Sequence, residues 1–127
     1  MTIIPDTSII IDGKLSYLIE KGDIEEDIVI PEFVVDELEN QANEGKETGY
    51  KGIEEIKEIR MLAKREGLKL EFKGRKPTTE EIEMAHSGRI DALIRDMAEE
   101  IEATLYTADQ VQGKVARAKG IDVREFE

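Results

Sequence analysis

The sequence contains no cysteine and no tryptophan, and its single histidine is His86. The lack of cysteine excludes a disulfide scaffold, a thiol nucleophile and a cysteine zinc site. A Ser-His-Asp triad would have to use His86, and a histidine-rich zinc site is impossible. We expect a structural or incidental role for this histidine, so several common classes of hydrolase and metal protein are ruled out.

Long apolar stretches are also missing. The longest, at residues 9–11 and 28–30, are far shorter than the ~20 residues that span a bilayer. Asp6 interrupts the N-terminus where a signal peptide would need a basic region followed by an apolar one. We therefore expect a soluble, cytoplasmic domain with no membrane partner.

Basic residues are scarce, since 18 Lys and Arg stand against 30 Asp and Glu, for a net charge of −12. Such a chain does not bind nucleic acid through bulk electrostatics, because affinity for phosphate comes from Lys and Arg. The balance still allows a nuclease that holds cations at a carboxylate site. The length of 127 residues suits one domain, and we expect residues 1–127 to form a single unit with a buried core.

Apolar runs bounded by turn residues alternate with segments of helical period along the whole chain. The runs predict strands at residues 2–4, 27–30, 68–72, 104–107 and 121–123. The third run alternates with charged residues, which places it nearer a sheet edge. Strands that alternate with helices favour parallel pairing with right-handed crossovers. The predicted fold is a three-layer α/β/α domain with a parallel sheet of about five strands.

The helical segments between these strands have recognisable ends. A helix over residues 8–21 is expected to break or bend at Gly13, and a long helix spans residues 49–65. Thr78 and Glu81 have the spacing of a capping box for a helix that runs to residue 85. Further helices are predicted at residues 33–43, 89–101 and 109–119.

Four acidic residues stand where such a sheet would gather them. Asp6 directly follows the first predicted strand, and Asp109 follows the fourth by two residues. Ligands bind beyond the carboxyl ends of the strands, where the strand order reverses, so these two converge if their strands are neighbours. Glu37 and Asp91 lie in helices that can face the same cleft. Carboxylates this close raise one another's pKa, which favours a hard divalent cation with oxygen ligands, Mg²⁺ or Mn²⁺.

Each of these acids also has a purely structural interpretation. Asp6 and Asp109 are both suitable N-cap residues for the helices that follow them. Glu37 is surrounded by other acids, as on a solvated helix face. Asp91 has the i,i+4 spacing to Arg95 of an ordinary surface pair. The prediction of a site therefore depends on the joint placement of all four.

The order of these segments resembles the PIN domain, a family that includes metal-dependent ribonucleases and the ribonuclease toxins of toxin–antitoxin pairs. The segments that carry the resemblance are Pro5-Asp6-Thr7-Ser8, Val34-Val35-Asp36-Glu37-Leu38, Arg89-Ile90-Asp91-Ala92-Leu93-Ile94 and Thr107-Ala108-Asp109. They cover essentially the whole chain. The resemblance implies that the catalytic and metal-binding residues are Asp6, Glu37, Asp91 and Asp109.

The last segments, at residues 107–111 and 115–121, are similar to archaeal PIN domains that precede an ATPase and an RNA-binding KH module. PIN domains joined to a TRAM domain show a comparable pattern. Gln110 and Gln112 stand where the toxin group usually carries a further acidic residue. This similarity implies the N-terminal domain of a longer protein, with fused or associated ATPase and KH domains. The family commonly pairs, and the helix at residues 49–65 offers apolar surface, so a homo-oligomer is expected.

The resemblance also implies a chemistry. One or two ions held by Asp6, Asp91 and Asp109 would activate a water and neutralise charge on the phosphate of an RNA substrate, leaving a 5′-phosphate. Glu37 would hold the second ion or orient the water. Hydrogen bonds to the ligand carboxylates or to metal-bound water are assigned to Thr7, Ser8 and Thr107.

Two alternatives remain open. The chain could be a weakly active or inactive PIN module that serves oligomerisation or RNA positioning in a larger ATPase. It could also be a toxin with an antitoxin partner.

Overall fold

The structure is a computed structural model that describes residues 1–75, 78–84 and 88–126. In chain order its elements are β1 (Thr2–Pro5), α1 (Thr7–Ile11), α2 (Lys14–Glu20), β2 (Asp27–Pro31), α3 (Glu32–Asn43), α4 (Glu47–Glu66), β3 (Leu70–Lys73), α5 (Thr79–Glu83), α6 (Arg89–Glu100), β4 (Thr104–Thr107), α7 (Gln110–Ala118) and β5 (Val123–Glu125). None of the helices in the described part of the chain has the length and apolar content needed to cross a bilayer.

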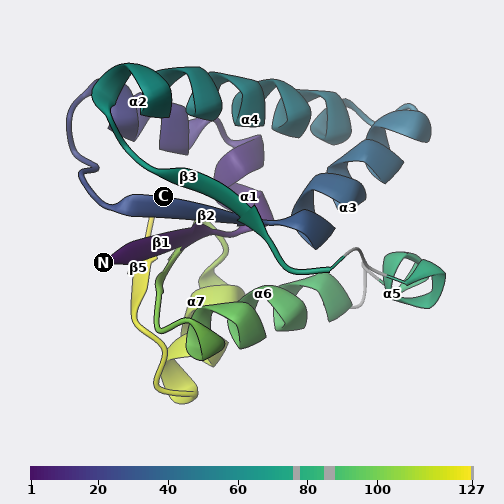
Figure 1. Cartoon of the computed structure of the whole chain (residues 1–127). Coiled ribbons are helices and arrows are strands. Elements are labelled where there is room, and N and C mark those ends of the chain that lie inside the picture. The colour runs from purple at the N-terminus through teal and green to yellow at the C-terminus, as the bar shows by residue number, and fades with distance from the viewer. Residues whose placement is uncertain (76–77, 85–87, 127) are drawn as a thin grey trace.

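The five strands form one sheet in the order β3-β2-β1-β4-β5, and every neighbouring pair is parallel. Helices α1, α2 and α4 cover one face and α6 and α7 cover the other (Figure 1). The predicted three-layer α/β/α architecture is confirmed, and β3 lies at a sheet edge as expected. The strand order reverses between β1 and β4, which are neighbours, so the condition for bringing Asp6 and Asp109 to one edge is met.

The core fills both faces of the sheet. Ile3, Ile4, Ile28, Ile30 and Leu105 of the three central strands are at most 1% exposed. Because helices cover both faces, these strands are continuous apolar runs and do not alternate between apolar and polar residues. At roughly 25 cal/mol per Å² of apolar surface, burial of each of these side chains contributes about 2 kcal/mol. The sheet is therefore a stable platform for the residues at its carboxyl edge.

The first helical segment is interrupted as its glycine predicts. Gly13 adopts a left-handed backbone conformation with φ of 72° and separates α1 from α2. Glu55 of α4 then satisfies the start of α2, because its carboxylate accepts hydrogen bonds from the backbone N–H of Ser16 at 2.8 Å and from Ser16 Oγ at 2.7 Å. Burial of Glu55 raises the pKa of its carboxyl group, against the effect of these hydrogen bonds. This contact joins α4 to α2, on the same face of the sheet as α1, the helix that begins directly after Asp6.

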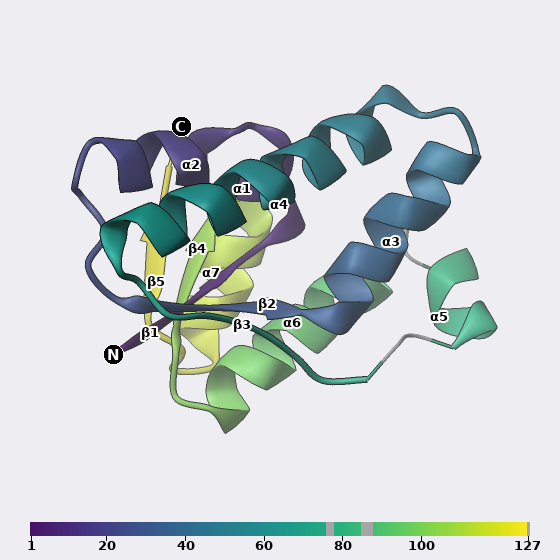
Figure 2. The same ribbon diagram turned by 45° about the horizontal axis from the view of Figure 1, so that its top comes forward.

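Helices α3 and α4 form a closely packed hairpin (Figure 2). A Cβ placed on Gly49 would meet the backbone of Ala42 and would lie 2.7 Å from the carbonyl oxygen of Leu38. A Cβ on Gly52 would lie within 3 Å of the Leu38 side chain. Only glycine permits this approach of the two backbones. The hairpin fixes α3, the helix that carries Glu37.

Several element boundaries differ from the sequence prediction, and β3 begins at Leu70, two residues later than the run at 68–72. The last strand is Val123–Glu125 and not 121–123, because Ile121 is buried as a core residue before the strand begins. Helix α4 extends beyond residues 49–65 at both ends, and α5 covers only Thr79–Glu83. The capping box is present, since Thr78 N donates to Glu81 Oε1 at 2.9 Å and Glu81 N donates to Thr78 Oγ1 at 3.2 Å. Residue 85, where that helix was expected to end, and His86 lie outside the described residues.

Candidate metal centre

Asp6 is the most buried acid at the carboxyl edge of the sheet, with 1% of its surface exposed. Its backbone N–H donates to the carbonyl oxygen of Tyr106 at 2.8 Å, which extends the pairing of β1 with β4. Asp6 stands at the N-cap position of α1, yet its side chain makes no cap hydrogen bond. The interpretation of Asp6 as a simple helix cap is therefore wrong. A buried carboxylate needs other partners, because burial of an uncompensated charge is costly.

Two hydroxyl groups hold the Asp6 carboxylate. Ser8 Oγ and Thr107 Oγ1 each lie 2.8 Å from Asp6 Oδ2 and donate to it. Both hydroxyls accept from the backbone at the end of β4, since Ala108 N donates to Ser8 Oγ at 2.9 Å and Asp109 N to Thr107 Oγ1 at 3.0 Å. Each hydroxyl has one hydrogen to donate, and Asp6 Oδ2 is its nearest side-chain acceptor. The carboxylate is thus locked to the turn that carries Asp109.

Glu37 lies on α3 and is half-buried. Thr7 Oγ1 donates to its Oε2 at 3.4 Å, and Gln41 Nε2 donates to its Oε1 at 3.2 Å. The pKa of Glu37 is raised to about 7, chiefly by burial and then by the negative charges of Asp91 and Asp6, while both hydrogen bonds act in the opposite direction. The charges of Asp91 and Asp6 thus act on Glu37, and its partial burial argues against a side chain on a fully solvated helix face.

Asp91 lies in the first turn of α6, where the helix dipole favours an anion. Its pKa is raised to about 6, first by burial and then by the charges of Asp6 and Asp109, while the charge of Arg95 lowers it. Arg95 does not form the simple surface pair with Asp91, because its Nη1 donates to Gln112 Oε1 at 2.6 Å. Asp91 is therefore coupled to the other carboxylates of the edge.

Asp109 is the N-cap of α7, as its structural interpretation predicted. Its Oδ1 accepts from the backbone N–H groups of Val111 at 2.9 Å and Gln112 at 3.3 Å. The same carboxylate also acts on Asp91, whose pKa it raises. Asp109 therefore has both a capping contact and a place in the acidic group, with Oδ2 as the oxygen that makes no cap contact.

Four acids from four separate elements thus influence one another at the switch point, and we call them the carboxylate group: Asp6, Glu37, Asp91 and Asp109. Their donors are all oxygen atoms, which is the ligand chemistry that Mg²⁺ and Mn²⁺ prefer. Within the described ranges, no three acidic or histidine side chains are already arranged as a ligand set for a metal ion. The residue types and the mutual repulsion fit a divalent cation, and the side chains would have to close around it.

Sequence reasoning missed the contacts of Gln112. The sequence shows only that it stands in place of an acid. In the structure it is 1% exposed, and its Nε2 donates to the Asp91 carbonyl oxygen at 3.0 Å and to Asp6 Oδ1 at 3.4 Å. The available signal was its place on the inward face of α7, with Gly113 and Ala116. A polar residue on an apolar helix face requires a partner.

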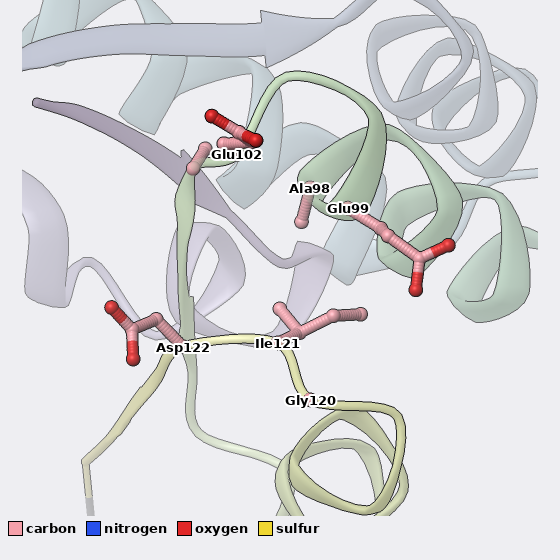
Figure 3. A pocket seen from close by; sticks show the side chains of 7 residues that line it. Ala98, Glu99, Glu102, Gly120, Ile121 and Asp122 are labelled. Carbon is pink, nitrogen blue, oxygen red and sulfur yellow. The ribbon is translucent and has the colours of Figure 1, made fainter.

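A separate hollow lies at the opposite edge of the sheet. It has a volume of about 290 Å³ and is formed by Ala98, Glu99, Glu102, Ala103, Gly120, Ile121 and Asp122. The acidic side chains point in different directions around it and do not converge (Figure 3). This hollow is at the amino end of β4, away from the carboxyl edge where α/β sheets bind ligands.

The sequence of residues 3–118 matches the model of the PIN domain. The chain belongs to the PIN domain family. The PIN domain is generally a nuclease fold.

Relatives agree with this assignment. A protein of Methanocaldococcus jannaschii, named as an uncharacterized KH and PIN-domain containing protein, is 48% identical over 118 residues, which cover 92% of this chain and 18% of that protein. The Holliday junction branch migration ATPase PINA of Sulfolobus acidocaldarius is 29% identical over 121 residues, 95% of this chain and 22% of the ATPase. The chain therefore spans about a fifth of the length of these curated relatives.

A solved structure shows the same fold. It is a domain of a functionally unknown protein from Methanocaldococcus jannaschii, 46% identical, with a TM-score of 0.93. The match covers 99% of this chain and 91% of that chain. Helices and sheet of the PIN domain described above are thus common to both proteins.

Proposed function

We propose that this PIN domain is a ribonuclease that hydrolyses RNA phosphodiesters with Mg²⁺ or Mn²⁺ at the carboxylate group. The observation that carries the proposal is that β1 and β4 pair at the switch point, where Thr107 links the Asp6 carboxylate to the backbone of Asp109. The raised pKa values of Glu37 and Asp91, to about 7 and about 6, support it. Keeping such groups ionised near neutral pH costs folding free energy. A bound divalent cation would offset the repulsion between the ionised carboxylates, so this group of acids is suited to bind one.

The residues divide the work according to their surroundings. Asp6, Asp91 and Asp109 would hold the ion, and the hydroxyls of Ser8 and Thr107 hold the Asp6 carboxylate in one orientation. The ion, when bound, supplies a more acidic water and neutralises charge that develops on the phosphate. No step requires His86.

Glu37 has the position of a water-orienting residue. Thr7 and Gln41 donate to its two carboxylate oxygens and so hold the side chain in one orientation. A carboxylate oxygen held in this way accepts a hydrogen bond from an attacking water and directs its lone pair at the phosphorus. Attack of the water in line with the scissile bond breaks the bond between phosphorus and the 3′ oxygen. That oxygen leaves as a 3′-hydroxyl with a proton given up by the water, and the other product carries a 5′-phosphate.

RNA is the proposed substrate because a KH module accompanies the PIN domain in the relative from Methanocaldococcus jannaschii. The name of the PINA relative contains a DNA structure, the Holliday junction, so DNA belongs in the test as the competing substrate. The net charge of −12 means that binding must depend on the ion and on local cations, since bulk attraction for phosphate is absent.

The test is cleavage of an end-labelled single-stranded RNA, and of DNA of the same sequence, during titration with Mn²⁺ or Mg²⁺. We expect Asp6→Asn and Asp91→Asn to lower the rate by at least about 100-fold, more than loss of an outer hydrogen-bond partner usually costs. Asp96→Asn is the matched control, because Asp96 is an exposed acid on the same helix as Asp91. Absence of metal-dependent cleavage by the wild type, or full activity of Asp91→Asn, would refute the proposal. Faster cleavage of the DNA would refute the choice of substrate.

A second candidate is a module that positions RNA or assembles a larger ATPase without cleaving. It is favoured by the lack, in the part of the chain that the structure describes, of a ready-made ligand set and by the ATPase relative. Assembly into a homo-oligomer would use the exposed apolar side chains Tyr50, Ile53 and Met61 of α4. Binding of RNA without cleavage, and a mass above that of one chain in light scattering that Ile53→Lys reduces, would support it.

A further inference from the structure

Gln112 contacts three members of the carboxylate group, two through its side-chain amide and one through its backbone N–H. Its Nε2 donates to Asp6 Oδ1 at 3.4 Å and to the carbonyl oxygen of Asp91 at 3.0 Å. Its backbone N–H is one of the two that Asp109 caps. The side chain is 1% exposed, so water cannot replace these contacts. A single residue on α7 thus contacts Asp6 between β1 and α1, the first turn of α6 and the cap of its own helix.

Arg95 fixes the orientation of that amide. The guanidinium Nη1 donates to Gln112 Oε1 at 2.6 Å, a short contact that a charged donor favours. The reverse orientation would set the amide NH₂ against the guanidinium and the amide oxygen against Asp6, and both contacts would be repulsive. The Nε of Arg95 is buried with no hydrogen-bond partner among the described residues. The guanidinium is therefore held in this place at the expense of one of its own hydrogen bonds.

The series of hydrogen bonds from Arg95 to Gln112 and from Gln112 to Asp6 gives the Asp6 carboxylate a hydrogen-bond donor and adds no negative charge beside it. A carboxylate at position 112 would also accept from Arg95, but it would repel Asp6 and could not donate to the Asp91 backbone. A glutamine is the residue that satisfies all three neighbours at once. The contact with the Asp91 backbone also sets where the first turn of α6 stands relative to β1.

We propose that Gln112, with Arg95 behind it, is a positioning residue that ties Asp6 to the first turn of α6 and so limits how far the carboxylates must move to bind Mg²⁺ or Mn²⁺. The inference rests on the proposed function, because it assigns Gln112 to the same centre. It predicts that the amide governs metal affinity, over and above its contribution to folding.

The experiment measures the dissociation constant for Mn²⁺ alone by calorimetry, without RNA, for the whole chain and its variants at 25 °C. Gln112→Met keeps the length and burial of the side chain and removes its hydrogen bonds without changing charge. We expect a 10- to 100-fold weaker constant, the range usual for loss of an outer hydrogen-bond partner of a metal ligand. Gln110→Met is the matched control, since Gln110 is exposed on the same helix, and its constant should equal that of the wild type.

A thermal melt of each variant separates positioning from folding. A purely structural role for Gln112 would lower the melting temperature and leave the Mn²⁺ constant within twofold of the wild type, which would overturn the inference. If Gln112→Met does not fold, Gln112→Asn, whose amide is one methylene short of both acceptors, must show the same weakening, and an unchanged constant there would equally overturn it. No Mn²⁺ binding by the wild type would defeat the proposed function itself, so the two failures are distinguishable.

Discussion

Replacing Glu37 by glutamine is expected to stabilise the metal-free protein while impairing its function. Glu37 is half-buried, and its pKa is raised from 4.5 to about 7 by burial and by the charges of Asp91 and Asp6. At pH 8 the carboxyl group is ionised in both the folded and the unfolded chain, and the raised pKa measures the cost of that charge in the fold. A shift of this size corresponds to about 3 kcal/mol at 1.36 kcal/mol per pKa unit.

Glutamine removes this cost but keeps the shape of the side chain. Thr7 and Gln41 can still form hydrogen bonds with the amide, although only one of its two polar atoms is an acceptor. Loss of one favourable contact offsets roughly 1 kcal/mol of the gain. We therefore expect the free energy of unfolding at pH 8 to rise by about 1–2 kcal/mol in the variant.

The assay is urea unfolding followed by circular dichroism, with a chelator present and over pH 5 to 8. A carboxyl group whose pKa is raised in the fold contributes stability that is fully present below pH 4.5 and is lost as the pH rises through about 7. The wild type should therefore lose stability across this range more steeply than Glu37→Gln. Glu39→Gln, on the exposed side of the same helix, is the control and should keep the wild-type slope.

Two results would refute this reasoning. The first is a Glu37→Gln variant that is less stable than the wild type at pH 8. The second is an unchanged dependence of stability on pH, which would mean that Glu37 is not repelled by its neighbours. Added Mn²⁺ should stabilise the wild type more than the variant, because the cation offsets the repulsion between Glu37 and its acidic neighbours, which the variant lacks.

Three further predictions concern other parts of the chain. Asp91→Asn should raise the stability of the metal-free protein at pH 8 by a smaller amount than Glu37→Gln. Asp91 is more exposed to solvent screening, and the charge of Arg95 already offsets part of its repulsion. Urea unfolding in the presence of chelator measures this, and a loss of stability would contradict it. Gly49→Ala should lower the free energy of unfolding by about 1–3 kcal/mol, the range for overpacking, because the new Cβ meets the α3 backbone. Replacement of the exposed Lys51 by alanine should be nearly neutral in the same assay. A neutral Gly49→Ala would argue against the close packing of α3 on α4. Glu81→Gln should lower the melting temperature at pH 7, because Arg75 donates two hydrogen bonds to the Glu81 carboxylate and holds its pKa down at about 2. The stabilisation from this ion pair is present above pH 4.5 and is lost as the pH falls toward 2. An equal loss of melting temperature at pH 7 and at pH 2 would contradict this.

Much of the fold follows from local signals in the sequence. The β-branched runs predict the strands, and Gly13, with its left-handed backbone, predicts the break between α1 and α2. The position of Asp6 directly after the first strand and of Asp109 after the fourth predicts their meeting, once β1 and β4 are neighbours. These features depend on residues close in sequence or on general rules of parallel sheets.

The remaining features depend on packing between distant segments. The predicted start of β5 is two residues too early, because Ile121 is a buried core residue that lies before the strand begins at Val123. The role of Gln112 could not be predicted, since it needs the first turns of α6 and α7 side by side so that Arg95 can reach the amide. The local sequence also does not tell whether Asp109 is a helix cap or acts on Asp91, and in the structure it does both.

The central claim is that the carboxylate group binds a divalent cation. The most direct measurement is an anomalous difference map from crystals of the protein soaked in Mn²⁺. The account predicts one or two strong peaks among the carboxylates of Asp6, Asp91 and Asp109, with Glu37 nearby and with no comparable peak in crystals of Asp6→Asn. Strong manganese peaks elsewhere on the acidic surface, with none at the switch point between β1 and β4, would contradict it.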